Sequence, residues 1–162
     1  MLIILRLGGV VMKVAIAADH GGYSLKEEIR ELLNELGHEV YDFGTNSLES
    51  VDYPDYALPV AEGVADGHFD RGILICGTGL GMSIAANKVP GVRAVVVHDT
   101  FSAKATRQHN DSNVLAIGGR VIGAGLAQEI VTVWLQTDFE GGRHSNRIQK
   151  ISEIENKYIN KE

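Results

Sequence analysis

The sequence has only one cysteine, Cys76, among its 162 residues. No disulfide bond can form within such a chain. This excludes the class of small secreted domains that disulfides stabilise and makes a reducing cytoplasm the expected compartment. Basic residues are also outnumbered, because 15 lysines and arginines stand against 21 aspartates and glutamates and give a formal net charge of −6. Nucleic-acid binding needs a clustered basic excess, so we expect no nucleic-acid partner.

Long apolar runs are absent as well. Residues 1–19 could be mistaken for a signal peptide, but Arg6 and Lys13 interrupt their apolar stretch. No run approaches the roughly 20 apolar residues of a membrane span, so we expect no membrane partner. We interpret residues 1–11 as an N-terminal extension and residues 12–162 as one domain, because 44% hydrophobic residues suffice for a single core at this length.

The rest of the sequence alternates short apolar runs with helical patterns. Strands are predicted at residues 13–18, 38–44, 71–76, 92–99 and 113–119. Helices are predicted at residues 25–36, 55–66, 80–88, 100–109 and 123–136, and Gly37 stands where a helix stop is expected. Continuous apolar strands are typical of a sheet covered on both faces. The pattern therefore predicts a three-layer α/β fold, a doubly wound, Rossmann-like parallel sheet of five strands with helices on both faces.

The end of the chain predicts a further helix at about residues 145–160. Ile148, Ile151 and Tyr158 recur there at helical spacing, with Ile154 or Glu155 between them. Such an apolar stripe on a terminal helix can pack on its own domain or on a partner subunit. We favour the partner, because association surfaces concentrate apolar side chains at their centre.

A glycine-rich turn, CGTGLG at residues 76–81, follows the third predicted strand. A strand that ends in such a turn and opens a helix points backbone N–H groups at an anionic group. The G-x-G-x-G spacing and the place after the third strand fit a dinucleotide fingerprint poorly. A P-loop is excluded, because no Gly-Lys-Ser/Thr follows.

The cysteine that opens this turn has two interpretations. Cys76 could be a small buried hydrophobe, the usual state of a free cysteine. At a strand end, however, it would face backbone amides at a helix N-terminus, where a thiol ionises readily and acts as a nucleophile or a base. Thr78 and the amides of Gly77, Gly79 and Gly81 could stabilise negative charge beside it. This combination suits proton abstraction from a carbon next to a carbonyl.

Other polar side chains follow the predicted strands and helices. Asp19 and His20 follow the first strand, where Asp19 could simply cap the helix that starts near Ser24. His109 and Asn110 stand at the end of the fourth helix. They could serve Cys76 in acyl transfer, which is the rival chemistry for such a thiol.

Three arginines stand near predicted strand ends: Arg120, Arg143 and Arg147. In this acidic chain they predict a local phosphate-binding site. Any one of them alone would more often belong to a solvated face. His38 and His68 fall in helix-to-strand connections on the opposite side of the sheet, and we interpret both as surface residues. No His, Cys or carboxylate spacing is typical of a metal site, so no metal is expected.

Four segments are distinctive: AADHGGYSLKEEI, DYPDYA, CGTGLGMSIAANKVPGVRA and RQHNDSNVLAIGGRVIG. With them the sequence closely resembles the ribose-5-phosphate isomerase B family, which includes galactose- and allose-phosphate isomerases, over about residues 12–155. The resemblance implies a homodimer, sometimes paired into tetramers, whose active sites combine residues of both subunits. It also implies interconversion of ribose 5-phosphate and ribulose 5-phosphate through an enediol, without a metal or an organic cofactor.

The same resemblance implies roles for individual residues. Cys76 falls at the position of the proton-transfer base. Positions tied to ring opening and to hydroxyl protons are Asp19, Thr78 and His109. Positions that bind the sugar and the enediolate are Tyr53, Gly77, Gly79, Gly81 and Asn110, and positions that bind the phosphate are His20, Arg120, Arg143 and Arg147.

Two alternatives stand beside a ribose-5-phosphate isomerase. One is an isomerase of a hexose 6-phosphate, allose or galactose, because pentose and hexose phosphates differ by one carbon. The other is a non-catalytic domain that binds a sugar or nucleotide phosphate, since a fold alone does not fix a function. A binding module has no use for a thiol beside an anion-binding turn, and Cys76 therefore favours an enzyme.

Overall fold

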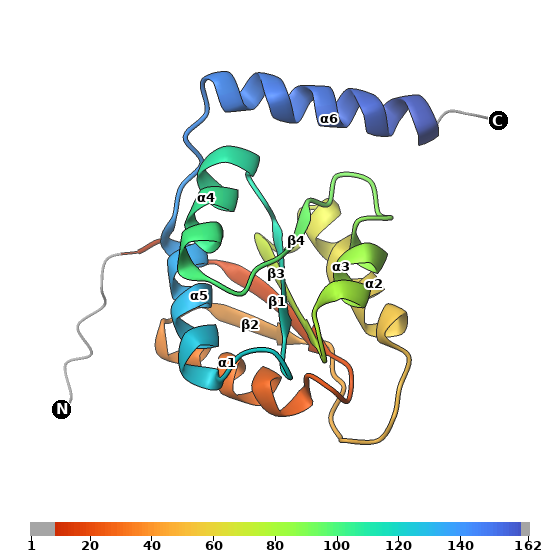
Figure 1. Ribbon diagram of the computed structural model, residues 1–162, viewed down its shortest axis with the longest axis vertical. Coiled ribbons are helices and arrows are strands. Elements are labelled where there is room, and N and C mark those ends of the chain that lie inside the picture. The colour runs from red at the N-terminus through yellow and green to blue at the C-terminus, as the bar shows by residue number, and fades with distance from the viewer. Residues whose placement is uncertain (1–8, 160–162) are drawn as a thin grey trace.

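Five parallel strands form one sheet in the computed structural model, which describes residues 9–159 (Figure 1). The strands are β1 (Lys13–Ala18), β2 (Glu39–Asp42), β3 (Arg71–Cys76), β4 (Ala94–Val96) and β5 (Val114–Gly118). Their order across the sheet is β2-β1-β3-β5-β4, and each neighbouring pair is parallel. The predicted parallel five-stranded sheet is confirmed.

Helices cover both faces of the sheet. α1 (Tyr23–Glu35), α4 (Thr100–Asn110) and α5 (Ala124–Gln136) lie on one face, and α2 (Tyr53–Ala65) and α3 (Leu80–Ala86) lie on the other. The side chains of β1 alternate accordingly, with Ile16 in the first apolar cluster and Ala15 and Ala17 in the second. The three-layer, doubly wound fold predicted from the apolar strands is therefore confirmed.

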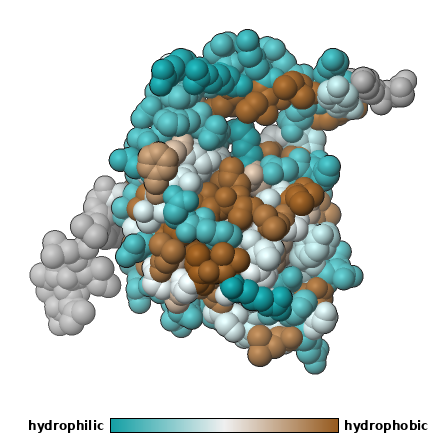
Figure 2. All heavy atoms as spheres, viewed as in Figure 1, coloured by the Kyte–Doolittle hydropathy of each residue, from teal (hydrophilic) through white to brown (hydrophobic). Residues whose placement is uncertain are grey.

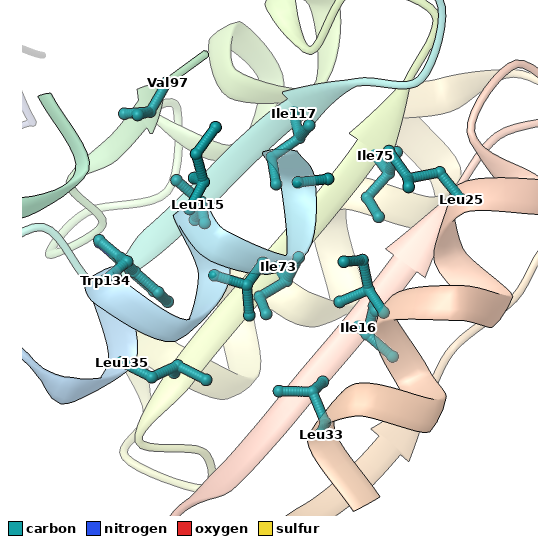
Figure 3. Packing of buried hydrophobic residues seen from close by; sticks show 14 of the residues in the cluster. Ile16, Leu25, Leu33, Ile73, Ile75, Val97, Leu115, Ile117, Trp134 and Leu135 are labelled. Carbon is teal, nitrogen blue, oxygen red and sulfur yellow. The ribbon is translucent and has the colours of Figure 1, made fainter. Parts of the chain in front are cut away.

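The larger apolar cluster lies between the sheet and the helices α1 and α5. Figure 3 shows Leu33 of α1 and Trp134 and Leu135 of α5 packed over Ile73 and Leu115 of the central strands. Trp134 is fully buried, and its indole N–H donates to Oγ of Ser112 at 2.9 Å. Because this hydrogen bond satisfies the only polar atom of the indole, the largest side chain of the core is buried without an unpaired donor.

The bounds of several elements differ from their predictions at the edges of the sheet. β2 spans residues 39–42 rather than 38–44, and β4 spans 94–96 rather than 92–99. Residues beyond them still contact the neighbouring strand, since the N–H of Phe43 donates to Ile16 and that of Val97 to Ala116, but the regular ladder ends where the chain turns, as at Gly44 with its φ of +89°. α2 begins two residues earlier than predicted and has proline in its first turn, where a proline needs no N–H partner. Gly37 has a φ of +82° after α1, which confirms the predicted helix stop.

The C-terminal helix α6 (Arg143–Ile159) lies across one end of the molecule, above α4 (Figure 1). Its only buried residue is His144, while Ile151 and Ile154 are 49% and 60% exposed. Figure 2 shows hydrophobic side chains gathered along this helix. The backbone N–H of Gly91 donates to both carboxylate oxygens of Glu155, at 3.1 and 3.0 Å, and ties the helix to the body of the protein. The partner subunit predicted for the apolar stripe stays a prediction.

Residues 1–8 of the predicted N-terminal extension lie outside the described residues. The three residues of the extension that are described, 9–11, are exposed. Within residues 9–159, none of the helices combines the length and the apolar character that crossing a membrane requires.

A buried lysine ties α1 to the end of β2. Lys26 is fully buried, and its Nζ lies 2.7 Å from Oδ2 of Asp42 and 2.9 Å from Oε1 of Glu27. Oδ1 of Asp42 accepts the backbone N–H of Gly44 at 2.8 Å. The carbonyl of Gly44 in turn accepts the N–H of Ala18, at the end of β1. One ammonium group therefore holds the connection between β2 and the carboxyl end of β1.

Replacing Lys26 by methionine should destabilise the fold. Lys26→Met keeps the length of the side chain but leaves Asp42, whose side chain is only 18% exposed, with Arg30 at 3.4 Å as its remaining cation. We expect the free energy of unfolding in urea to fall by about 3 kcal/mol, as when one partner of a buried ion pair is removed. Lys88→Met, at an exposed lysine, is the control and should stay within about 0.5 kcal/mol. Equal urea midpoints for the two variants would contradict the role of Lys26.

Candidate active site

The order in which the chain adds strands to the sheet changes direction between β1 and β3. The chain leaves β1 for β2 on one side, and all later strands lie on the other side. In doubly wound sheets, ligands bind outside the carboxyl ends of the strands at such a switch point. Asp19 directly follows β1 and Cys76 ends β3, so both residues stand at this point.

The turn after β1 packs directly on the end of β3. The N–H of Asp19 donates to the carbonyl of Ile75 at 3.2 Å. A Cβ atom on Gly22 would overlap that carbonyl oxygen, and one on Gly21 would lie 3.0 Å from the nitrogen of Gly77. Only glycines fit here, because two backbones are in contact.

Asp19 caps this turn rather than the helix. Its Oδ1 accepts the N–H groups of Gly21 at 2.8 Å and of Gly22 at 3.2 Å. The N-cap residue of α1 is Gly22, and no side chain caps the helix. The alternative that Asp19 caps a helix near Ser24 is therefore wrong in its detail. The carboxylate instead holds the glycine turn against β3.

The sulfur of Cys76 is buried within the glycine-rich turn. The residue is 5% exposed, and its Sγ accepts the N–H of Gly79 at 3.0 Å. Gly79 has a φ of +77°, a conformation that side chains disfavour, and this φ is part of the bend that brings its N–H to the sulfur. This hydrogen bond holds the sulfur in place within the turn. Thr78 is exposed next to this bond, and its Oγ1 accepts the N–H of Leu80.

Further predicted residues surround the turn. The ring of Tyr53 packs against Gly81, where an added Cβ would lie only 2.8 Å from Cζ of the tyrosine. The guanidinium of Arg120 packs against Gly77 in the same way, with Nη1 3.0 Å from the position of an added Cβ. The N–H of Arg120 also donates to the carbonyl of Gly77 at 3.0 Å. The carboxyl end of β5 is thus joined to the thiol-bearing turn.

His20 is held by a segment that sequence reasoning did not consider. The backbone N–H of Val51 donates to its Nδ1 at 3.2 Å. A nitrogen that accepts a hydrogen bond carries no proton, so the ring proton of neutral His20 is on Nε2. His20 can therefore donate a hydrogen bond through Nε2 to an anionic ligand.

A single chain thus brings together, at the carboxyl edge of the sheet, most of the predicted site: Asp19, His20, Tyr53, Cys76, Gly77, Thr78, Gly79, Gly81 and Arg120. These residues supply a thiol, a carboxylate, backbone donors and two groups that can bind an anion. The arrangement can take a proton from a bound molecule and stabilise the resulting negative charge.

The remaining predicted residues lie at the opposite edge. α4 starts after β4 at the carboxyl edge and returns, so His109 and Asn110 at its end stand near the start of β5. The carbonyl of Asn113, just before β5, accepts the N–H of Gly72 near the start of β3. The five residues of β5 span about 16 Å. Within one chain, therefore, His109 and Asn110 cannot reach Cys76.

Arg143 and Arg147 lie in the first turns of α6, beside the end of α4. The three arginines predicted to form one phosphate-binding site are therefore separated within one chain. Arg120 lies near Cys76, and the other two lie at the opposite edge of the sheet. The prediction placed them together because it treated all of them as following strands. The chain continues through α5 and a connecting segment before α6 begins, and this carries Arg143 away from the end of β5.

His144 has a position that sequence reasoning missed. It is 6% exposed, and its ring stacks on that of His109 with centroids 4.5 Å apart and an interplanar angle of 15°. Burial lowers the pKa of His144 from its ordinary value, and the charges of His109, Arg143 and Arg147 lower it further. The available signal was its place between two arginines that had themselves been singled out.

Of the two histidines interpreted as surface residues, His68 is exposed, as predicted. His38 is only half exposed, because its Nδ1 accepts the N–H of Met12 at 3.3 Å and joins the start of β2 to the start of β1. Burial lowers the pKa of His38. Its role is therefore structural, at the edge opposite Cys76.

The fold and the site define a class: a doubly wound α/β protein with a thiol in a glycine-rich turn at its switch point. Comparison with known proteins makes the assignment more specific. The sequence profile of the ribose/galactose isomerase family matches residues 14–151, and the chain belongs to this family.

Individual relatives agree over nearly their whole length. The chain is 56% identical over 143 residues to ribose-5-phosphate isomerase B of Escherichia coli, covering 88% of this chain and 96% of that protein. Ribose-5-phosphate isomerase B of Clostridium thermocellum has a solved structure with 59% identity and a TM-score of 0.89, covering 91% and 99%. The enzyme of Mycoplasma genitalium, solved with bound ribulose 5-phosphate, has 43% identity and a TM-score of 0.86, covering 89% and 96%.

Adding one methyl group at the backbone contact should disrupt the site. Gly22→Ala forces a Cβ into the Ile75 carbonyl, so we expect loss of soluble, folded protein or a strongly lowered thermal midpoint. Gly125→Ala is the matched control, because nothing lies within 4 Å of the added atom and the residue is in α5. An alanine in a helix stabilises by up to about 1 kcal/mol relative to glycine, so the control should be unchanged or more stable. Thermal unfolding followed by circular dichroism makes the comparison, and matching midpoints would refute the contact.

Proposed function

We propose that this protein is an aldose–ketose isomerase that interconverts ribose 5-phosphate and ribulose 5-phosphate. The observation that carries the proposal is the sulfur of Cys76, buried at the switch point with a backbone N–H donated to it. Its relatives named ribose-5-phosphate isomerase B support the substrate, since one of them matches at 56% identity over most of both chains. The same relatives support a place in pentose phosphate metabolism.

The reaction requires one base that moves a proton between neighbouring carbons. In this proposal the Cys76 thiolate takes the proton from C2 of the open-chain aldose, and the electron pair of that C–H bond enters an enediolate. The thiol then returns the proton to C1, while a hydroxyl proton moves from O2 to O1. The hydrogen bond from the N–H of Gly79 fixes the position of the sulfur.

The enediolate needs donors that are already in place. The exposed hydroxyl of Thr78 can supply one, and the amides of residues 77–81 other than those of Gly79 and Leu80, which are donated to Cys76 and Thr78, can supply others. Asp19 has Oδ1 engaged by two glycine amides and is held rigidly near the same point. We assign Asp19 and Thr78 to the movement of hydroxyl protons, and Tyr53 and the turn glycines to contact with the sugar.

The phosphate would bind at the far end of the sugar from Cys76. His20, as an Nε2–H donor, and Arg120 supply one side of this site from the same chain. Arg143 and Arg147 lie at the opposite edge, so the proposal takes them from a partner subunit. His109 and Asn110 come with them, because they share that edge.

The proposal includes a homodimer with shared sites, and this separation supports it. In one chain, about 16 Å of β5 separates the residues around Cys76 from those around His109. In a two-fold symmetric dimer, the residues around Cys76 of each subunit can meet the residues around His109 of the other, which gives two complete sites. The exposed apolar residues Ile151 and Ile154 of α6 give such a pair a surface to bury. The proposed compartment is the cytoplasm, where the single thiol stays reduced.

A second substrate is favoured by the family itself, whose description names galactose as well as ribose. Turnover with ribose 5-phosphate, ribulose 5-phosphate, allose 6-phosphate and galactose 6-phosphate, compared as kcat/KM, decides between pentose and hexose. Higher kcat/KM for a hexose phosphate would revise the substrate. Binding of all four without turnover would support a non-catalytic sugar-phosphate domain instead.

Removing the thiol should separate chemistry from binding. Cys76→Ala should lower kcat by at least about a hundredfold, the lower range for losing a general base, while ribose 5-phosphate still binds. The base acts on the proton and contributes little to ground-state binding. Titration calorimetry measures the binding and also shows that the variant is folded. Turnover close to that of the unmodified protein would refute the assignment of Cys76 as the base.

Two inactive variants should restore activity when they are mixed. If sites are shared, a heterodimer of Cys76→Ala and His109→Ala contains one site with both defects and one with neither. Random exchange makes about half of the dimers heterodimeric, so activity should recover to about a quarter of that of the unmodified enzyme. Differently tagged chains must first show that subunits exchange. Proven exchange without recovered activity would place all catalytic residues in one chain.

A further inference from the structure

Three metal-binding side chains meet at the edge of the molecule away from Cys76. One ligand atom each from His109, Glu140 and His144 lies within 4.8 Å of the others. Nε2 of His144 is 3.6 Å from Oε2 of Glu140. We infer that these three side chains form an inhibitory binding site for a first-row transition ion such as Zn²⁺.

The backbone around this cluster is already fixed. The N–H of Glu140 donates to the carbonyl of Gln108, next to His109, at 3.1 Å. This bond joins the end of α4 to the segment before α6. The N–H of His144 donates to the carbonyl of Gly141 at 3.1 Å, and its ring is buried. Ion binding therefore requires side-chain movement and leaves the chain path unchanged.

The movement needed is small. Atoms that share one tetrahedral zinc ion at bond lengths of about 2.0–2.2 Å lie roughly 3.3 Å apart. The cluster at 4.8 Å must therefore contract by about 1.5 Å at most. The two imidazole rings are stacked nearly parallel, so their lone pairs do not converge on one point. His109 and Glu140 are exposed and free of the core, and rotation of His109 brings its nitrogen toward the others.

The ligand set selects the kind of ion. Two imidazoles and one carboxylate suit zinc, copper, nickel or iron, whereas calcium and magnesium prefer oxygen ligands alone. The ring of His144 can bind an ion only through an unprotonated nitrogen. Arg143 and Arg147 act on the same ring and oppose a cation electrostatically. An ion that binds here must gain its affinity from coordination bonds, as transition ions do.

The consequence for activity rests on the proposed function, in which His109 belongs to the partner's substrate site. A bound ion would hold His109 on Glu140 and His144 and withdraw it from the substrate. It would therefore inhibit in competition with the sugar phosphate. The ion is an inhibitor here and has no part in the reaction.

Titration calorimetry with Zn²⁺ on the untagged protein tests the site without any assay of activity. We expect one ion per chain, with the dissociation constant raised about tenfold or more by Glu140→Gln and by His144→Gln, since each removes a ligand. Glu62→Gln on α2 and the exposed His68→Gln are the matched controls and should bind as the unmodified protein does. Visible absorption of bound Co²⁺ gives an independent measure of the same coordination.

The outcomes separate cleanly. Saturable binding that both ligand variants weaken and both controls keep supports the site, even if the chain has no isomerase activity. Absence of saturable binding overturns it. Binding that survives Glu140→Gln unchanged, or that Cys76→Ser abolishes, also overturns it, because the ion is then held elsewhere. If Zn²⁺ binds as expected but does not inhibit isomerisation, the proposed role of His109 in the reaction is wrong while the metal site stands.

Discussion

The site depends on the contact between two stretches of bare backbone. The turn at Gly21 and Gly22 lies against the carbonyl of Ile75 and the amide of Gly77, where no side chain fits. The next strand joins the same contact, since a Cβ on Gly119 would lie 2.9 Å from the carbonyl of Gly21. Because the ends of three strands meet without side chains between them, the functional groups that follow each strand converge on one small volume.

Two carboxylates, those of Asp19 and Asp42, stabilise the backbone around this contact. Asp19 fixes the glycine turn through its amides, and Asp42, paired with buried Lys26, fixes the neighbouring loop through Gly44. Neither carboxylate needs to act on a substrate to be essential. The positions of the reactive groups are thus set by hydrogen bonds to backbone, which change little when surface side chains vary.

Much of the fold could be predicted from the sequence, because the signals are local. Apolar runs gave the strands, and Gly37 and the glycine-rich turn marked the ends of elements where a positive φ is needed. The thiol and the groups around it were also found, since carboxyl ends of parallel strands meet at one edge. These inferences need only the order of elements along the chain.

The relations that sequence reasoning could not place depend on distance in space. Arg143 and Arg147 were grouped with Arg120, and only the path of the chain through α5 shows that they stand at the other edge. The cluster of His109, Glu140 and His144 joins His109 to two residues more than 30 positions later, so spacing along the chain does not reveal all three members. The strands at the sheet edges were predicted too long, because a hydrophobic pattern does not report where the regular hydrogen-bond ladder ends.

The segment between Gly44 and Val51 has an evolutionary consequence. It is anchored only near its ends, by Gly44 and Thr45 on Ala18 and by Val51 on His20, and residues 46–50 are all exposed. Its middle can change in length and composition without disturbing the backbone contact that positions the thiol. Related proteins can therefore diverge in this segment while the arrangement of backbone around Cys76 is inherited unchanged.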